Sequence, residues 1–282
     1  MNTACEASSH NGLLGVCAAS EDQVAAATRL ANRLKLPFLP GEPQLKQRDS
    51  DQLLLVQADD GPAIFLTGRR SPGAVRVDFA SKALAHRRQS GHNELLGRAV
   101  GWSAETPPTV LDATAGFGRD AFVLADLGCE VHLFERNPVM ATLLDLAAGR
   151  AMRSTDARLR QLASRMQVHA GDVRLHSETL LGQDAVNVIY LDPMFPPERK
   201  ALPGKEMQVL HRLLSVEVDR GTPERVYYQG LAEELLAWSL DQDVQRVVVK
   251  RPRREKALSG RAPGHSLEGR SIRFDVYPVA SN

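Results

Sequence analysis

From residue 109 to residue 250, short apolar runs alternate with segments of helical periodicity. A repeated order of strand then helix predicts an α/β fold with a parallel, doubly wound sheet and right-handed crossovers. The predicted strands are residues 109–113, 131–135, 166–170, 186–191 and 245–250.

Two additions interrupt or follow this alternation. Between the fourth and fifth predicted strands, leucines at helical spacing over residues 207–214 and 231–236 predict two helices where one would suffice. After residue 250 we expect a basic loop and then a terminal hairpin around residues 271–277.

The N-terminal residues follow a different plan. Residues 21–34 carry apolar side chains at helical spacing, and two apolar runs within residues 53–66 flank a turn rich in Asp, Gly and Pro. Residues 75–79 alternate apolar and charged side chains, the period of a half-buried strand. We therefore expect a small α+β domain over residues 1–80 and the doubly wound domain over residues 81–282.

Composition excludes several classes of protein. A hydrophobic content of 43% against 24% charged residues is typical of a globular chain and excludes overall disorder. The formal net charge of +1 does not decide for or against a polyanionic partner. Cys5, Cys17 and Cys129 lack the spacing of a zinc site or disulfide framework, so we expect no metal and a buried structural role for Cys129. The absence of a signal or membrane span predicts a cytoplasmic protein without membrane contact.

A strand, a glycine turn and the start of a helix follow one another over residues 110–120. Gly116 and Gly118 let the backbone approach a ligand closely, and the helix N-terminus that follows offers N–H groups to an anion. Glu135 ends the next predicted strand, where a carboxylate can accept both ribose hydroxyls of an adenosine. A plain glycine turn beside a solvent-facing acid is the alternative, but strand, helix and spaced acid together favour a cofactor site.

Two classes of cofactor compete for this site. The spacing of Gly116, Gly118 and Ala121 satisfies the dinucleotide fingerprint, and the acid that follows would suit NAD equally well. In dinucleotide folds, however, the glycines leave the strand directly, whereas here Asp112 lies at the strand end, four residues before Gly116. The pattern resembles the first motif of Rossmann-like class I S-adenosylmethionine methyltransferases, with Thr114 replacing its first glycine. That resemblance implies that Asp112 and the turn hold the methionine end of the cofactor.

A second motif closes the fourth predicted strand, at the edge where open α/β sheets bind ligands. Asp192, Pro193 and Phe195 resemble the Asp/Asn-Pro-Pro-Tyr/Phe motif of amino-group methyltransferases, with Met194 in place of the second proline. An aromatic amine is a poor nucleophile because its lone pair is delocalised into the ring. Accepting its N–H groups with the Asp192 carboxylate and the Pro193 carbonyl would draw the nitrogen toward tetrahedral geometry, and Phe195 can stack on the base. A turn that ends the strand is the alternative for the Asp-Pro pair.

A base inside a duplex could not enter such a pocket, so we expect a single-stranded or flipped nucleotide as substrate. Two basic clusters support a polyanionic partner through salt-dependent phosphate contacts, and solvated surface charge is the alternative. The stretch Lys250–Arg254 follows the fifth predicted strand on the same sheet edge as Asp192, which favours function there. The first cluster is Arg246, Lys250, Arg251, Arg253, Arg254, Lys256 and Arg261, and the second is Arg69, Arg70, Arg76, Lys82, Arg87 and Arg88.

Four stretches together resemble the small-subunit ribosomal RNA guanine-N2 methyltransferases of the RsmJ type: residues 111–122, 134–138, 190–196 and 246–252. The Thr-Ala-Gly turn combined with Asp-Pro-Met-Phe-Pro is the most specific part, and the resemblance runs in order across residues 75–278. It implies S-adenosylmethionine as cofactor, methyl transfer to N2 of one guanine, and 16S rRNA or the small ribosomal subunit as partner. The residues expected to contact the cofactor are Asp112, Gly116, Gly118, Arg119, Asp120, Glu135, Arg136, Gly171, Asp172 and Asp192. Asp172, after the third predicted strand, matches the place where the class I methyltransferase superfamily contacts the adenine amine, and a helix cap is the alternative.

Four other functions stay open at this point. DNA adenine and protein glutamine methyltransferases use related Asp/Asn-Pro motifs. A nonenzymatic RNA-binding module could retain a relict cofactor pocket. An NAD-dependent dehydrogenase ranks low, because we expect no His or Lys that could act as an acid or base beside the end of the fourth strand.

Overall fold

The computed structural model describes residues 13–49, 52–69, 73–81, 84, 92–182, 186–193, 204–214 and 223–279. The chain divides into two compact units. The small unit comprises Met1–Arg76 and Pro196–Glu224, and the large unit comprises Val77–Phe195 and Arg225–Asn282. The segment 196–224 thus groups with the N-terminal residues, a return of the chain that the sequence pattern does not predict. The division into domains 1–80 and 81–282 stays a prediction.

The small unit contains a three-stranded sheet. β1 (Leu13–Ala18) pairs in parallel with β2 (Leu53–Ala58), and β2 pairs antiparallel with β3 (Gly61–Leu66). Its helical segments are η1 (Glu21–Gln23), α1 (Val24–Leu34) and α9 (Lys205–Leu214), the last packed on β2 and β3. The predicted helix and hairpin are confirmed, and β1 is an additional strand.

The strand predicted over residues 75–79 is wrong. Val75 forms an isolated bridge with Ile64, and no ladder continues from it within the described residues. Val77 and Phe79 are nevertheless buried. The alternation of apolar and charged residues therefore records which side chains leave the solvent, and does not require pairing with a neighbouring strand.

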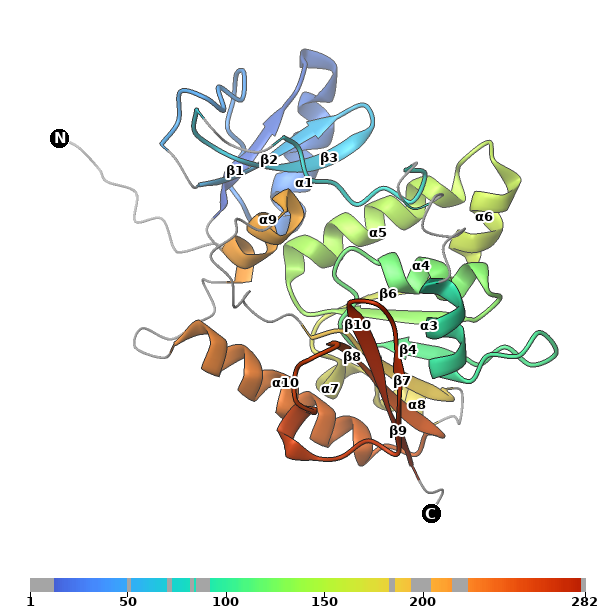
Figure 1. Cartoon of the computed structure of the whole chain (residues 1–282). Helices are drawn as coiled ribbons and strands as arrows, with labels where there is room; N and C mark the ends of the chain where they lie inside the picture. Colours follow the sequence, from blue (N-terminus) through green and yellow to red (C-terminus); the bar gives the residue numbers. More distant parts are fainter. Residues whose placement is uncertain are drawn as a thin grey trace. The chain divides into compact units, whose positions relative to one another are not determined.

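The large unit is built on a seven-stranded sheet of order β6-β5-β4-β7-β8-β10-β9 (Figure 1). The strands from β6 to β8 in this order are parallel, and β10 and β9 extend the sheet as an antiparallel hairpin. The strands are β4 (Val110–Asp112), β5 (Val131–Glu135), β6 (Met166–Ala170), β7 (Val188–Leu191), β8 (Arg246–Pro252), β9 (His265–Glu268) and β10 (Ile272–Pro278). The five predicted strands and the terminal hairpin are confirmed, and β4 and β7, which carry the two motifs, are neighbours.

Helices cover both faces of this sheet, with α10 on one side and α4 and α5 on the other (Figure 1). Successive strand residues point to opposite faces, so Ile189 and Val247 pack with Leu236 of α10 while Tyr190 faces α4. Burial on both faces explains the uninterrupted apolar runs of β7 and of residues 247–249 in β8, whereas the edge strand β6 is only partly buried. The helices are α3 (His92–Val100), α4 (Arg119–Asp126), α5 (Pro138–Met152), α6 (Ala157–Ser164), α7 (Val173–His176), α8 (Glu178–Leu181), α10 (Glu224–Leu240) and η3 (Leu258–Gly260).

The described cysteines are free, and the described helices give no membrane span. Cys17 and Cys129 are buried free thiols, which confirms the buried position expected for Cys129, and Cys5 lies outside the described residues. Within the part of the chain that the structure describes, no helix has the length and apolar character needed to cross a membrane.

Gly118, at the start of α4, is required by packing of the protein itself. Its φ is +68°, in the left-handed region that side chains with a Cβ rarely adopt. A Cβ added there would lie 2.8 Å from Leu144 Cδ1 and 3.0 Å from Phe79 Cζ. The interpretation from sequence, in which this glycine lets a ligand approach, therefore misses the main reason for a glycine here, which is its left-handed φ and its close packing against Leu144 and Phe79.

We expect Gly118→Ala to lower the free energy of unfolding by about 2–4 kcal/mol, because it combines left-handed strain with overpacking. Urea denaturation followed by circular dichroism measures this. Gly230→Ala is the control: it lies in α10, its added Cβ would meet no atom within 4 Å, and helix propensity should stabilise it by about 0.5–1 kcal/mol. A Gly118→Ala protein as stable as the wild type would contradict the packing argument.

Candidate active site

Carboxylates gather at the carboxyl ends of four neighbouring parallel strands. Asp112 ends β4 and Glu135 ends β5, while Asp172 follows β6 and Asp192 follows β7. These strands are adjacent in the order β6-β5-β4-β7, so their ends form one continuous edge. Ligands of open α/β sheets bind at this edge.

The glycine turn is tied to Glu135. Gly116 N–H donates to Glu135 Oε2 at 2.9 Å, and Asn137 N–H donates to Glu135 Oε1 at 2.8 Å. Gly116 has a φ of +52°, and a Cβ there would have no atom nearer than the Thr114 carbonyl at 3.8 Å. The turn is thus open on that side. Each carboxylate oxygen has a second acceptor site, so Glu135 can also accept hydroxyl groups.

Thr114 joins the two sequence motifs. Its N–H donates to Asp112 Oδ1 at 3.1 Å, and its Oγ1 accepts the N–H of Asp192 at 2.7 Å. The residue that departs from the glycine pattern of the first motif therefore fastens the second motif to it. Sequence reasoning missed this role, for which the hydroxyl at a glycine position was the available signal.

Asp112 is an acid buried within a group of acids. Its side chain is almost completely removed from solvent, and its pKa is raised to about 8, first by burial and then by the charges of Asp120, Asp192 and Glu135. The hydrogen bond from Thr114 N–H opposes this shift of the pKa only in part. At neutral pH the carboxyl therefore holds a proton, and a cation bound beside it would favour the ionised form.

Lys250 of β8 lies beside the end of the fourth predicted strand, β7, and contacts Asp192. Its Nζ is 2.8 Å from Asp192 Oδ2 and 2.7 Å from Asp120 Oδ2, and Tyr190 OH donates to the same oxygen of Asp120 at 2.7 Å. The expectation that no Lys lies beside this strand end is wrong. β8 pairs in parallel with β7, with Val249 opposite Leu191, so the next residue of β8 comes level with Asp192.

Asp172 caps α7. Its Oδ1 accepts the N–H of Arg174 at 3.0 Å, and both carboxylate oxygens accept from the Arg174 guanidinium. These side-chain hydrogen bonds from Arg174 are the main reason that the pKa of Asp172 is lowered. The helix-cap alternative is confirmed, and contact with adenine stays a prediction. Gly171 has a φ of +122°, and a Cβ there would lie 2.6 Å from His176 Cδ2.

The other predicted site residues take varied positions. Arg119 begins α4, with its guanidinium carbon 5.7 Å from the centre of the Phe117 ring. Arg136 is exposed after β5, and Pro193 is half-buried after β7. Phe195 lies outside the described residues. The assignment of each to cofactor or substrate stays a prediction.

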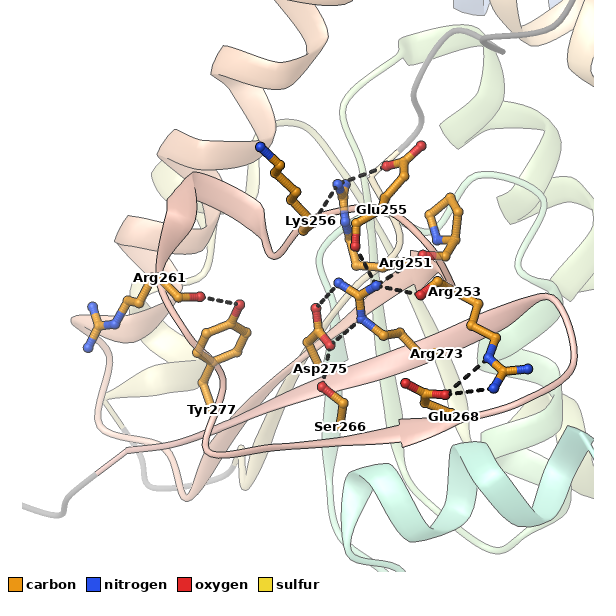
Figure 2. Close-up of polar contacts among 11 residues, drawn as sticks. Arg251, Arg253, Glu255, Lys256, Arg261, Ser266, Glu268, Arg273, Asp275 and Tyr277 are labelled. Atoms are coloured by element: carbon orange, nitrogen blue, oxygen red, sulfur yellow. Dashed lines mark hydrogen bonds and ion pairs between the residues drawn. The ribbon is translucent and has the colours of Figure 1, made fainter.

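The β8–β9 loop (residues 253–264) is fastened by Arg273 of β10, as Figure 2 shows. The buried Arg273 guanidinium donates from Nε to Asp275 Oδ1 at 2.7 Å and from Nη2 to Asp275 Oδ2 at 3.0 Å. Its Nη1 donates to the backbone carbonyl oxygens of Pro252, Arg253 and Glu255. One side chain therefore sets the path of the chain as it leaves β8.

Members of the first basic cluster differ in orientation. The prediction of phosphate contacts is wrong for Lys250 and Arg251, which are turned inward; Arg251 Nη2 donates to the Lys256 carbonyl and pairs with Glu255 (Figure 2). Arg253 pairs with Glu268 at the surface. The exposed members on the β8–β9 loop also include Arg254, Lys256 and Arg261.

Of the second cluster, Arg76 pairs with Asp60, Arg69 is exposed, and Arg70, Lys82, Arg87 and Arg88 lie outside the described residues.

The groups present suit a cationic, hydroxylated ligand. No cluster of three or more metal-binding side chains occurs among the residues that the structure describes. Carboxylates can pair with ammonium and sulfonium groups and accept from hydroxyls and amines, which are the polar groups of S-adenosylmethionine. The site residues therefore fit that cofactor.

The buried acid generates a testable dependence of stability on pH. The pKa of Asp112 is about 8 in the folded protein against an ordinary 3.8, so between these values the folded state holds a proton that the unfolded state releases. Wild-type stability should therefore fall as pH rises, by at most about 1.4 kcal/mol per pH unit from this group. We expect the stability of Asp112→Asn relative to wild type to increase by about 1–4 kcal/mol from pH 5 to pH 8, measured by urea denaturation. A difference independent of pH would contradict the account.

Comparison with known proteins identifies relatives along nearly the whole chain. A family model described as "Putative SAM-dependent methyltransferase" matches residues 39–279. A protein from Pseudomonas aeruginosa named ribosomal RNA small subunit methyltransferase J is 41% identical over 94% of this chain and 94% of its own. One of the same name from Cellvibrio japonicus is 39% identical over 92% of this chain and 94% of its own. The crystal structure of a SAM-dependent methyltransferase from Neisseria gonorrhoeae matches with a TM-score of 0.64 and 31% identity, covering 93% of this chain and 95% of that one.

These matches decide between the two classes of cofactor. S-adenosylmethionine is the cofactor, and the Rossmann-like class I fold is confirmed. The NAD-dependent dehydrogenase is excluded on this ground, and not on the ground expected from the sequence, since Lys250 does lie at the strand end. The chain belongs to the SAM-dependent methyltransferases and, among them, to the family of ribosomal RNA small subunit methyltransferase J.

Proposed function

We propose that this enzyme transfers a methyl group from S-adenosylmethionine to the exocyclic N2 of one guanine in 16S rRNA, in the small ribosomal subunit and therefore in the cytoplasm. The substrate class is supported by the relatives, which are named for the RNA of the small subunit and match along more than nine-tenths of their length. The observation that carries the reaction is the hydrogen bond from Asp192 N–H to Thr114 Oγ1, because it joins the amine-binding motif to the cofactor turn.

The proposed cofactor residues surround the acid-rich edge. When bound, S-adenosylmethionine supplies an electrophilic methyl group on a sulfonium. Asp112 and the Gly116 turn would hold its amino-acid end, where an ammonium beside the buried carboxyl would favour the ionised form of Asp112. Glu135 accepts ribose hydroxyls with its remaining acceptor sites, and Asp172 faces the adenine amine. Further proposed contacts are Gly118, Arg119, Asp120, Arg136 and Gly171.

The proposed acceptor residues are Asp192, Pro193 and Phe195. The Asp192 carboxylate and the Pro193 carbonyl accept the two N–H groups of the guanine amine, and Phe195 stacks on the base. With the cofactor bound, the amine nitrogen would form a bond to the methyl carbon as the carbon–sulfur bond breaks, leaving the neutral thioether S-adenosylhomocysteine. The surplus amine proton would pass to the Asp192 carboxylate that accepts its hydrogen bond, and from there to water. Since the methyl transfer is an in-line displacement, the protein contributes mainly position and desolvation.

The exposed side of the β8–β9 loop is the proposed contact with the RNA backbone. Arg254, Lys256 and Arg261 are exposed on it, and the loop leaves β8 at the same edge as Asp192. Arg273 holds the start of the loop by three carbonyl oxygens, so its cations are presented by an ordered backbone. Phosphates bound there would lie near a nucleotide whose base enters the site.

Label transfer from tritiated S-adenosylmethionine tests the function. Undermodified small subunits, naked 16S rRNA, genomic DNA and total protein serve as acceptors, followed by nucleoside chromatography. We expect label in N2-methylguanosine from small-subunit RNA. Asp192→Asn keeps one accepting oxygen but loses the negative charge that strengthens the hydrogen bond from the amine, so it should reduce kcat by about tenfold or more and change cofactor affinity by less than about tenfold.

The control for this variant is Asp241→Asn, the same change at an exposed position near the end of α10, which should match the wild type. Label in DNA adenine or in protein would favour those alternative substrates. Label nowhere, with cofactor still bound, would favour a nonenzymatic binding module. Full activity of Asp192→Asn would remove the proposed role of that residue.

The loop proposal predicts a defect that depends on salt. The double variant Arg254→Glu and Lys256→Glu should raise KM for the RNA substrate by about tenfold or more and reduce the slope of log affinity against log salt by about 1–2. The kcat at saturating substrate and the affinity for cofactor should stay at the wild-type value. Arg153→Glu, an exposed change at the end of α5, controls for charge reversal. Equal salt slopes for the double variant and wild type would place the RNA elsewhere.

A further inference from the structure

A lysine side chain lies inside the proposed site, where the sequence favoured phosphate contacts. Lys250 Nζ pairs with Asp120 Oδ2 at 2.7 Å and with Asp192 Oδ2 at 2.8 Å. The Lys250 side chain is 16% exposed, against 40% for Asp192. A phosphate would have to displace both carboxylates to reach the ammonium, so Lys250 acts on the protein's own groups.

The inner end of this network is held by the core. Tyr190 is fully buried in the middle of the sheet, and its hydroxyl donates to Asp120 Oδ2. Asp120 is itself buried in the first turn of α4. Phe274 of β10 lies opposite Lys250 in register, and the centres of the Phe274 and Tyr190 rings are 6.4 Å apart. The Lys250 ammonium is therefore held on its buried side by Asp120, and Asp192 is its partner on the more exposed side.

Acidic groups of several described elements act on this network. Burial alone would lower the pKa of Lys250, but Asp192 and Asp120 together raise it by more, so the pKa of Lys250 is raised overall. Lys250 is thus a cation throughout the working pH range and offsets the repulsion between the two carboxylates. Among the described residues, the titratable groups of the surrounding elements include Asp112 of β4, Asp120 of α4, Glu135 of β5, and Tyr190 and Asp192 at the end of β7.

We propose that Lys250 is a positioning residue for methyl transfer: its ammonium, anchored by Asp120 and Tyr190, holds the Asp192 carboxylate ionised and in one orientation toward the acceptor amine. This inference rests on the proposed function, in which Asp192 accepts the amine N–H. Each oxygen of a carboxylate can accept more than one hydrogen bond, so Asp192 can keep the lysine and receive the amine together. A compact ammonium with three donors suits this role, because it can bridge carboxylates on different elements.

The variant Lys250→Met removes the charge while nearly keeping side-chain length, and is tested in the full-length protein with small ribosomal subunits. We expect kcat to fall by about 30-fold and KM for S-adenosylmethionine to change by less than about threefold. The acidic limb of the kcat profile should move to higher pH, because a carboxylate that loses a neighbouring cation protonates more readily. Lys250→Arg, which keeps the charge, should keep that limb near its wild-type position. Lys46→Met, at an exposed lysine of the small unit, is the matched control.

Two further variants apply if Lys250→Met does not fold. Tyr190→Phe removes one hydroxyl from the anchor and should lower kcat by about three- to tenfold, with the acidic limb moving in the same direction. In an Asp192→Asn background, a change at Lys250 should cause little additional loss, because residues that act as a unit are not additive.

The outcomes separate this inference from the proposed function. If the wild-type enzyme methylates no RNA, the proposed function is overturned and this inference with it. If the wild type is active and Lys250→Met, or Tyr190→Phe in its place, keeps the wild-type kcat and pH profile, the inference alone is overturned. A full, additive loss in the Asp192→Asn background would overturn it as well.

Discussion

The parallel register of β5, β4, β7 and β8 is the constraint on which the whole site depends. Because these strands run in one direction, Asp112, Glu135 and Asp192 reach the same edge from separate parts of the chain. Short hydrogen bonds then connect neighbouring strand ends: Glu135 accepts from the Gly116 turn, and Thr114 accepts from Asp192. A shift of one residue in any pairing would turn the side chains to the other face and break these links.

The charge distribution at this edge favours function over stability. Burial and neighbouring acids raise the pKa of Asp112 to about 8, an arrangement that a fold selected for stability alone would avoid. The Lys250 ammonium offsets part of the negative charge of these carboxylates through its ion pairs with Asp120 and Asp192. A ligand carrying an ammonium and a sulfonium would offset more of it. The electrostatic strain of the protein without ligand is therefore consistent with the cofactor that the family uses.

Much of this fold could be predicted from the sequence, because the parallel strands are mostly short apolar runs and four of the five, β4 to β7, end at or run into an acid. The orientation of Lys250 could not, because in Arg246–Pro252 the basic residues look like a solvated charge run, and only the pairing with β7 shows that Lys250 comes level with Asp192. Thr114 appeared as a departure from a motif, yet its hydroxyl carries the link between the motifs. The alternation of apolar and charged residues over 75–79 indicates which side chains are buried, but it does not produce a strand. The grouping of 196–224 with the small unit depends on tertiary packing, which local sequence does not specify.

A crystal structure with S-adenosylhomocysteine would test the central claim, that the acid-rich edge binds the cofactor directly beside Asp192. We expect the amino-acid end at Asp112 and the Gly116 turn, the ribose hydroxyls on Glu135, and the sulfur on the side of Asp192, with Lys250 still paired to Asp120 and Asp192. A cofactor bound away from Asp112 and Glu135, or one whose sulfur points away from Asp192, would contradict it.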